Sequence, residues 1–137
     1  LNPKANGWRL PTEAEEEYLI RGGTKTRFSF GDNEEDSNNY AWTAENSNNT
    51  THPVAEKRAN GFGLYDVHGN VWEQCYDGYQ QTPPLGVDPV SSSGSYRVIR
   101  GGGWSGHAEN AGSAYRDNRH PGYCGSDVGF RPVRTNP

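Results

Sequence analysis

The sequence predicts a small α+β domain that combines a short sheet and few helices with extensive irregular loops. Its 137 residues suit one domain rather than two. The 18 glycines and 9 prolines predict a backbone dominated by turns. A mean hydropathy of −1.02 favours disorder, but 4 tryptophans, 8 tyrosines and 4 phenylalanines are enough aromatic residues to build a core.

The first regular element is expected to be a short helix from Glu13 to Arg21. Thr12 and Glu15 have the spacing of a capping box, in which a hydroxyl and a carboxylate each accept a hydrogen bond from an amide of the first turn. The acidic residues near Glu13 suit the positive end of the helix dipole, and Arg21 suits the negative end. Gly22 supplies the left-handed residue that ends such a helix.

Two loop regions separate the remaining elements. The polar tract 24–60 is expected to be a long coil, which is uncommon in a compact domain unless the coil is functional or packs on itself. We expect four aromatic residues to anchor it: Phe28, Phe30, Tyr40 and Trp42. A second loop, 77–95, is rich in Pro, Gly and Ser and carries no recognisable chemistry.

Short strands are expected at Tyr96–Arg100 and Val128–Val133. They frame a segment that is crowded with Ser, Gly, His, Asn, Asp and Tyr. Tyr offers a large contact area at a small entropic cost, and Ser, Gly and Asn adapt their hydrogen bonding. The composition therefore predicts two scaffold ends with a recognition surface between them.

Charge and hydropathy exclude two classes of partner. The net charge is −4 and the 13 basic residues are scattered, so we expect no nucleic-acid partner. No run of about 18 apolar residues is present, so we expect no membrane-spanning segment. The first residues lack the pattern of a signal peptide. Leu1 is not a natural start, which indicates a processed chain or a fragment.

The cysteines and histidines suggest no transition-metal site. Cys75 and Cys124 either pair in an exported protein or remain two free thiols, and free thiols are the favoured interpretation. No two cysteines have the two-residue spacing of a zinc or redox site. The histidines lack the spacing of metal ligands, so we expect all four in surface or turn positions: His52, His68, His107 and His120.

The segment 60–76 contains a possible cation site. Asp66 and Glu73 flank a Gly-Asn turn, so two carboxylates and the carbonyls of the turn are able to converge. Ligands that are all oxygen atoms suit calcium, not zinc or copper. The alternative, which the spacing alone favours, is that Asp66 caps a turn and Glu73 accepts hydrogen bonds from buried amides.

Four motifs occur in an order that resembles the sulfatase-modifying-factor family, whose best-known member is the formylglycine-generating enzyme. They are GWRLPTEAE at 7–15, NGFGLYDVHGNVWE at 60–73, RVIRGGGW at 97–104 and GFR at 129–131. The resemblance implies a C-type-lectin-like α+β fold of the formylglycine-generating-enzyme variety. It also implies a single domain over residues 1–137 that lacks an N-terminal part.

The resemblance also implies a structural calcium ion. Its ligands would be the side chains of Asp66 and Glu73 and the backbone carbonyls of Gly69 and Val71, and this outweighs the alternative drawn from spacing. Glu16 departs from the family, which usually has Trp at this position. A core aromatic is therefore lost from the first helix.

The chemistry of the related enzyme is not expected here. Formylglycine formation in the family needs a pair of cysteines that bind copper(I), as soft thiolates are suited to do. The pair would fall between Ser105 and Arg116, where this chain reads SGHAENAGSAYR and has no cysteine. We therefore expect no copper and no enzymatic activity. The alternative is a formylglycine-generating or related oxidase that uses other residues.

The C-terminal layout further resembles the variable proteins of diversity-generating retroelements, especially the treponemal surface type. In these systems a reverse transcriptase mutates adenines, which turns asparagine codons of a template into codons for many residues. The frame of that pattern is matched by Arg97, Val98, Arg100, Gly101, Gly102, Trp104, Ala108, Asn110, Ser113, Ala114, Arg116, Pro121, Gly122, Gly129, Phe130 and Arg131.

Twelve residues that stand between these frame positions are each reachable from an asparagine codon by adenine changes. They are Ser105, Gly106, His107, Tyr115, Asp117, Asn118, His120, Tyr123, Cys124, Gly125, Ser126 and Asp127. The alternative is an ordinary loop, rich in Gly and Asn, of an inactive family member. The resemblance implies a monomeric, non-catalytic ligand-binding protein, displayed outside the cell or on its surface. Its ligand would be a protein or another surface ligand of variable identity.

Within this variable region, 105–127, specific roles are expected. Tyr115 and Tyr123 would be aromatic anchors, because binding energy concentrates in Tyr, Trp and Arg. Polar specificity would come from His107, Asp117, Asn118, His120 and Asp127. Packed support without ligand contact would come from Trp104, Arg116 and Phe130.

Overall fold

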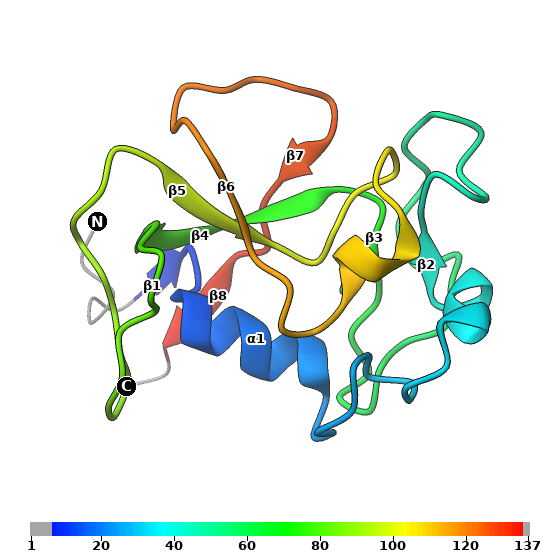
Figure 1. The fold of residues 1–137 in the computed structure, drawn as a ribbon, viewed down its shortest axis with the longest axis horizontal. Coiled ribbons are helices and arrows are strands. Elements are labelled where there is room, and N and C mark those ends of the chain that lie inside the picture. The colour runs from blue at the N-terminus through cyan, green and yellow to red at the C-terminus, as the bar shows by residue number, and fades with distance from the viewer. Residues whose placement is uncertain (1–6, 136–137) are drawn as a thin grey trace.

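A mixed four-stranded sheet forms the centre of the computed structural model, which describes residues 7–135 (Figure 1). Its strands are β6 (Asp117–Arg119), β5 (Arg97–Arg100), β4 (Trp72–Gly78) and β7 (Val128–Gly129), in that order across the sheet. Strand β5 is antiparallel to both β4 and β6, whereas β7 is parallel to β4. The buried side chains of Val98, Ile99, Trp72 and Cys75 place the core on β4 and β5.

The helix α1 (Glu13–Arg21) lies alongside this sheet and confirms the sequence prediction in its bounds and in both caps (Figure 1). The Thr12 hydroxyl accepts a hydrogen bond from the Glu15 amide at 3.2 Å, and the Glu15 carboxylate accepts one from the Thr12 amide at 2.8 Å. Gly22 ends the helix with a φ of 57°. Among residues 7–135, no helix is long and apolar enough to cross a membrane.

The strand predictions are correct for β5 within one residue and wrong for the stretch 128–133. That stretch contains two strands, β7 and the start of β8 (Val133–Thr135), and β8 pairs with β1 (Gly7–Arg9) in a separate two-stranded sheet. The break falls at Arg131 and Pro132. The Arg131 side chain turns inward to Glu73, and Pro132 has no amide for a strand hydrogen bond.

The polar tract packs on itself around the expected aromatic anchors. Phe30 lies between Phe28 and Tyr40, with ring centroids 4.8 Å and 4.5 Å away. Trp42 stacks on His52 at 3.6 Å. The regular elements here are short: η1 (Glu34–Asn39), and β2 (Ala41–Trp42) parallel to β3 (His68–Gly69). The coil is therefore an ordered part of the domain, not a linker.

His68 is buried, so the expectation that all four histidines are surface or turn residues is wrong for this one. Its Nδ1 lies 2.7 Å from the carbonyl oxygen of Ala111, in η2 (Ala108–Ala111), and its Nε2 accepts a hydrogen bond from the Ser29 amide at 3.1 Å. Nδ1 therefore carries the proton. Burial lowers the pKa of His68 to about 4, so the ring is neutral at physiological pH.

Glu16 occupies the core position at which the family usually has Trp. Its side chain is fully buried, and its carboxyl group interacts with the carboxylate of Glu73. Burial, together with the neighbouring carboxylate of Glu73, raises the pKa of Glu16 to about 9. The carboxyl is therefore protonated at neutral pH, and a neutral acid fills the aromatic's place.

Replacing this acid by its neutral amide should change how stability depends on pH. Because the folded-state pKa of Glu16 lies above its ordinary value of 4.5, its contribution is fully present below pH 4.5 and is lost as pH rises to about 9. Between pH 5 and pH 8 the native chain should therefore lose about 1.4 kcal/mol per pH unit relative to Glu16→Gln. Urea unfolding across this range measures the difference.

Glu35→Gln is the matched control, since Glu35 is exposed and its removal should leave the pH profile unchanged. Parallel pH profiles for Glu16→Gln and the native chain would contradict a protonated Glu16 in the core.

Candidate recognition surface

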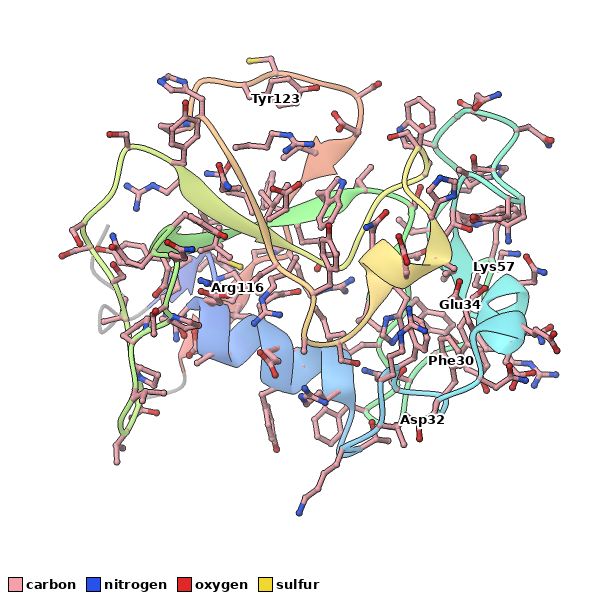
Figure 2. All side chains as sticks on the ribbon, in the orientation of Figure 1. Phe30, Asp32, Glu34, Lys57, Arg116 and Tyr123 are labelled. Atoms are coloured by element: carbon pink, nitrogen blue, oxygen red, sulfur yellow. The ribbon has the colours of Figure 1, made fainter. Side chains whose placement is uncertain are left out.

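All twelve residues that the sequence assigns to the variable positions reach solvent. We call this set the variable patch: Ser105, Gly106, His107, Tyr115, Asp117, Asn118, His120, Tyr123, Cys124, Gly125, Ser126 and Asp127. None of them is buried, whereas six of the frame positions are: Val98, Arg100, Gly101, Gly102, Ala108 and Ser113. Figure 2 shows Tyr123 in the loop between β6 and β7, on the far side of the sheet from α1.

Arg116 joins the variable region to α1, as its expected supporting role requires. Its Nε and an Nη each bind one oxygen of Glu13, both at 2.6 Å, and Glu13 is 5% exposed. A second arginine, Arg100, lies 3.2 Å from the same carboxylate. Arg100 also donates to the carbonyls of Ser113 and Tyr115, at 3.1 Å and 3.0 Å. These two arginines therefore fix the backbone on either side of Tyr115.

The side chain of Tyr115 is partly exposed at the mouth of a cleft of about 610 Å³. Its ring lies 6.0 Å from that of Trp72. The cleft is also lined by the basic residues Arg21, Lys25 and Arg27 and by the acidic Glu109. Arg21 and Arg27 are paired with Glu17 and Glu34, so the cleft has little net charge.

Phe130 does not have the packed supporting role expected from the sequence. It is 67% exposed and lines a groove of about 300 Å³ together with Leu10, Val128 and Tyr123. The expectation fails because β7 is an edge strand that ends at Gly129, and Phe130 lies in the unpaired stretch between β7 and β8. Trp104, by contrast, is half-buried, and its indole N–H donates to the Ser126 carbonyl at 3.3 Å.

Apart from Tyr115, the variable patch has two parts that are held by different neighbours. Residues 105–107 lie on the turn at 43–45, where Gly106 accepts a hydrogen bond from the Ala44 amide at 2.9 Å. The His107 Nδ1 lies 2.8 Å from Glu45, and this carboxylate raises the pKa of His107. The larger part comprises β6 and the loop 120–127, where His120 packs edge-on against Tyr96 at 6.2 Å.

Arg119 belongs to this larger part although the sequence pattern placed it in neither the frame nor the variable set. Its guanidinium lies 3.2 Å from the Asp117 carboxylate and 4.0 Å from that of Asp127. The only sequence signal for its role is its position, one residue from variable positions on either side. The cysteines are both free, with Cys75 buried in β4 and Cys124 exposed in the loop.

The four residues expected to bind calcium lie around a tight turn. Asp66 and Gly69 have positive φ angles of 55° and 78°, and a Cβ on Gly69 would overlap the backbone of Trp42. The carboxylate of Asp66 accepts a hydrogen bond from the Ala55 amide at 2.8 Å. Val71 follows the turn. Its carbonyl, that of Gly69 and the two carboxylates are all oxygen donors, the type of ligand that calcium prefers.

Glu73 is already paired with a cationic side chain of this protein, Arg131. Arg131 binds both of its carboxylate oxygens, at 2.7 Å and 2.9 Å. Although burial of the guanidinium opposes it, the Glu73 carboxylate raises the pKa of Arg131. Among residues 7–135, no three side chains of His, Cys, Asp or Glu are grouped as metal ligands, so a cation here would depend on carbonyl oxygens as well.

Comparison with known proteins places this geometry in a family. The sulfatase-modifying factor enzyme 1-like domain matches residues 2–136. Treponema denticola variable protein 1 superposes with a TM-score of 0.89 and 42% identity, over 96% of this chain and 49% of that one. Chaperone protein LppX of Paenibacillus barcinonensis is 34% identical over 98% of this chain and 52% of its own length. The formylglycine-generating enzyme of Streptomyces coelicolor is 37% identical over 91% and 46%.

This chain therefore spans about half the length of these relatives. The matches confirm the expected C-type-lectin-like fold of the formylglycine-generating-enzyme variety and the resemblance to treponemal variable proteins. The chain belongs to the sulfatase-modifying factor enzyme 1-like domain family.

Proposed function

We propose that this protein is a non-catalytic ligand-binding protein that displays a hypervariable surface on a C-type-lectin-like scaffold. One observation carries the proposal: all twelve residues of the variable patch reach solvent, whereas six of the sixteen frame positions are buried. A loop whose sequence served only packing would mix buried and exposed residues without regard to the asparagine-derived pattern. The likeness to Treponema denticola variable protein 1 supports the same conclusion.

The proposed contact residues differ in how they are presented. Tyr115 and Tyr123 are 40% and 47% exposed, and each lines a hollow whose other walls come from the scaffold. Such half-exposed tyrosines are able to anchor a partner, because they bury apolar area and still offer a hydroxyl. His107, Asp117, Asn118, His120 and Asp127 would add polar specificity around them.

The partner is proposed to be a protein or another surface ligand whose identity changes with the patch. A surface built to vary recognises no single chemistry, so specificity resides in the particular residues present. We further propose that the chain acts as a monomer, outside the cell or on its surface, where such ligands are met.

Calcium is proposed as a structural ligand of Asp66, Glu73 and the carbonyls of Gly69 and Val71. The oxygen-only donor set and the tight turn support it. Arg131 would share Glu73 with the ion or give up one of its two bonds. No role in ligand recognition follows, since these residues are separate from the variable patch.

The alternative function is a formylglycine-generating or related oxidase, because the family includes such enzymes. Cys75 is enclosed in β4, where burial raises the pKa of its thiol well above the ordinary value and so disfavours the thiolate that copper(I) requires. Cys124 is exposed in the variable loop. Stoichiometric copper(I) uptake, with aldehyde formation on a cysteine-containing peptide, would establish the oxidase and refute the non-catalytic proposal.

The coding sequence tests the diversification directly. Adenine mutagenesis of an asparagine codon leaves its third base as C or T. His, Tyr, Asp, Asn and Cys always have such codons, so the informative positions are Ser105, Gly106, Gly125 and Ser126. Sequencing the gene should show C or T at the third base in all four, with a near-identical repeat nearby that carries adenines at the divergent positions, beside a reverse-transcriptase gene.

The frame serines and glycines, such as Ser113 and Gly102, are the control, since their third bases are free to differ. An A or G third base at any of the four informative positions, or the absence of the repeat, would remove diversification from the proposal.

Calcium should stabilise the folded chain if Asp66 and Glu73 are ligands. A ligand that binds only the native state at 100 times its dissociation constant adds about 2.7 kcal/mol to the free energy of unfolding. Thermal unfolding should therefore occur several degrees higher in calcium than in chelator, with no such shift for magnesium, which demands a tighter octahedral shell. The Glu73→Gln chain should lose the shift. Equal midpoints of the native chain in calcium and in chelator would contradict the site.

A further inference from the structure

The ring of Tyr123 packs directly against Gly125. A Cβ added to Gly125 would overlap the hydroxyl and ring atoms of Tyr123. Gly125 has no positive φ that would itself demand glycine, so the requirement comes from the neighbouring ring alone. Gly122, in the same loop, has room: its Cβ would lie 3.4 Å from His120, an ordinary contact. Two variable positions, 123 and 125, are therefore sterically coupled.

Hydrogen bonds hold the ring in this position. The Tyr123 hydroxyl donates to the Asp127 carboxylate at 2.9 Å, and that carboxylate raises the pKa of Tyr123. The Tyr123 amide donates to the His120 carbonyl at 2.9 Å, which closes the first turn of the loop. At the other end the Asp127 carbonyl accepts a hydrogen bond from the Trp72 amide at 2.8 Å, which attaches the loop to β4.

Arg119 connects this loop to the edge strand β6. Its guanidinium donates to the Asn118 carbonyl at 2.9 Å, pairs with Asp117, and lies 4.0 Å from Asp127 and 5.9 Å from the centre of the Tyr123 ring. The Asp117 carboxylate also accepts a hydrogen bond from the Asn118 amide at 2.7 Å. Three variable positions, 117, 123 and 127, thus share contacts with one arginine.

We propose that residues 119–127 form a preformed recognition element, in which positions 123, 125 and 127 determine specificity as one unit and Arg119 and Gly125 are positioning residues. The inference rests on the proposed function, because it concerns part of the same recognition surface. A preformed loop loses less conformational freedom when a partner binds. It also means that a change at one of the three positions alters how the residues at the other two are presented.

A double-mutant cycle on the loop tests the coupling without any ligand. The variants are Gly125→Ala, Tyr123→Ala and the two combined, with Gly122→Ala as the matched glycine control. Amide hydrogen exchange of residues 119–128 is the first readout. NMR titration of the chain with Cζ-labelled tyrosine, which resolves the individual tyrosines, is the second. Amides of β4 and β5 serve as an internal reference for global stability.

Gly125→Ala should displace the Tyr123 ring and lower the Tyr123 pKa toward its ordinary value. It should also speed amide exchange in the loop about tenfold, which is the effect of losing roughly one net hydrogen bond. In the Tyr123→Ala background the same substitution should have no further effect on exchange. Gly122→Ala should match the native chain. Arg119→Ala should also speed exchange in the loop, whereas Arg58→Ala, which removes an exposed arginine elsewhere, should not.

Two results would overturn the proposal: an unchanged Tyr123 pKa and unchanged exchange in Gly125→Ala, or equal effects of that substitution with and without Tyr123. Failure of the proposed function would look different from either result. A gene without diversification, or oxidase activity, would refute the proposed function, but the coupling measured within the loop would still be present.

Discussion

The ion pairs of Glu13 connect the N-terminal helix to the segment that carries the variable patch. Its buried carboxylate receives Arg116 from the chain leading into β6 and Arg100 from the end of β5. Its backbone amide donates to Asp77, at the end of β4, at 2.8 Å. A buried carboxylate that lost both arginines would be an unpaired charge in the core, which typically costs several kcal/mol. The start of α1 is therefore the place where the helix contacts both the sheet and the segment that leads into the variable patch.

This arrangement separates folding from recognition along a single stretch of chain. Arg100 and Ser113 are buried, and the Arg100 guanidinium donates a hydrogen bond to the Ser113 carbonyl. The residues of the variable patch, by contrast, reach solvent, and some of them bond to one another, as Tyr123 does to Asp127. Changes in the second group leave the first untouched, which is the property that a surface meant to vary requires. The coupling among Tyr123, Gly125 and Asp127 limits that freedom locally.

Local signals made part of the fold predictable from sequence. The helix was predicted to the residue because Thr12, Glu15 and Gly22 each act within one turn of it. Strand β4 was missed because Trp72–Gly78 is buried on both faces and has no simple alternation of polar and apolar residues. The split of the last strand at Pro132 and the inward turn of Arg131 depend on a partner, Glu73, that is 58 residues away in sequence.

The site was predictable to a different degree. The twelve variable positions follow a pattern in the residues themselves, and their exposure agrees with it. Arg119 escaped the pattern because its role depends on Asp117 and Asp127 being close in space. Phe130 was misassigned because a position in a motif does not reveal whether a sheet edge is covered. The burial of Glu16 shows the same limit, since an acid in place of a core aromatic signals a loss but not where the acid will lie.

The central claim is that the variable patch serves recognition and contributes little to folding. The most direct test is the free energy of unfolding of a chain in which every residue of the patch is asparagine, measured against the single frame variant Arg116→Asn. Exposed substitutions usually change stability by about 0.5 kcal/mol or less each. The asparagine chain, in which eleven residues change because Asn118 is already asparagine, is expected to keep one cooperative transition and to lose no more than about 0.5 kcal/mol per substitution, whereas Arg116→Asn alone should lose several times that amount by weakening the pairing of buried Glu13. Loss of cooperative unfolding in the asparagine chain, with Arg116→Asn close to native, would contradict the claim.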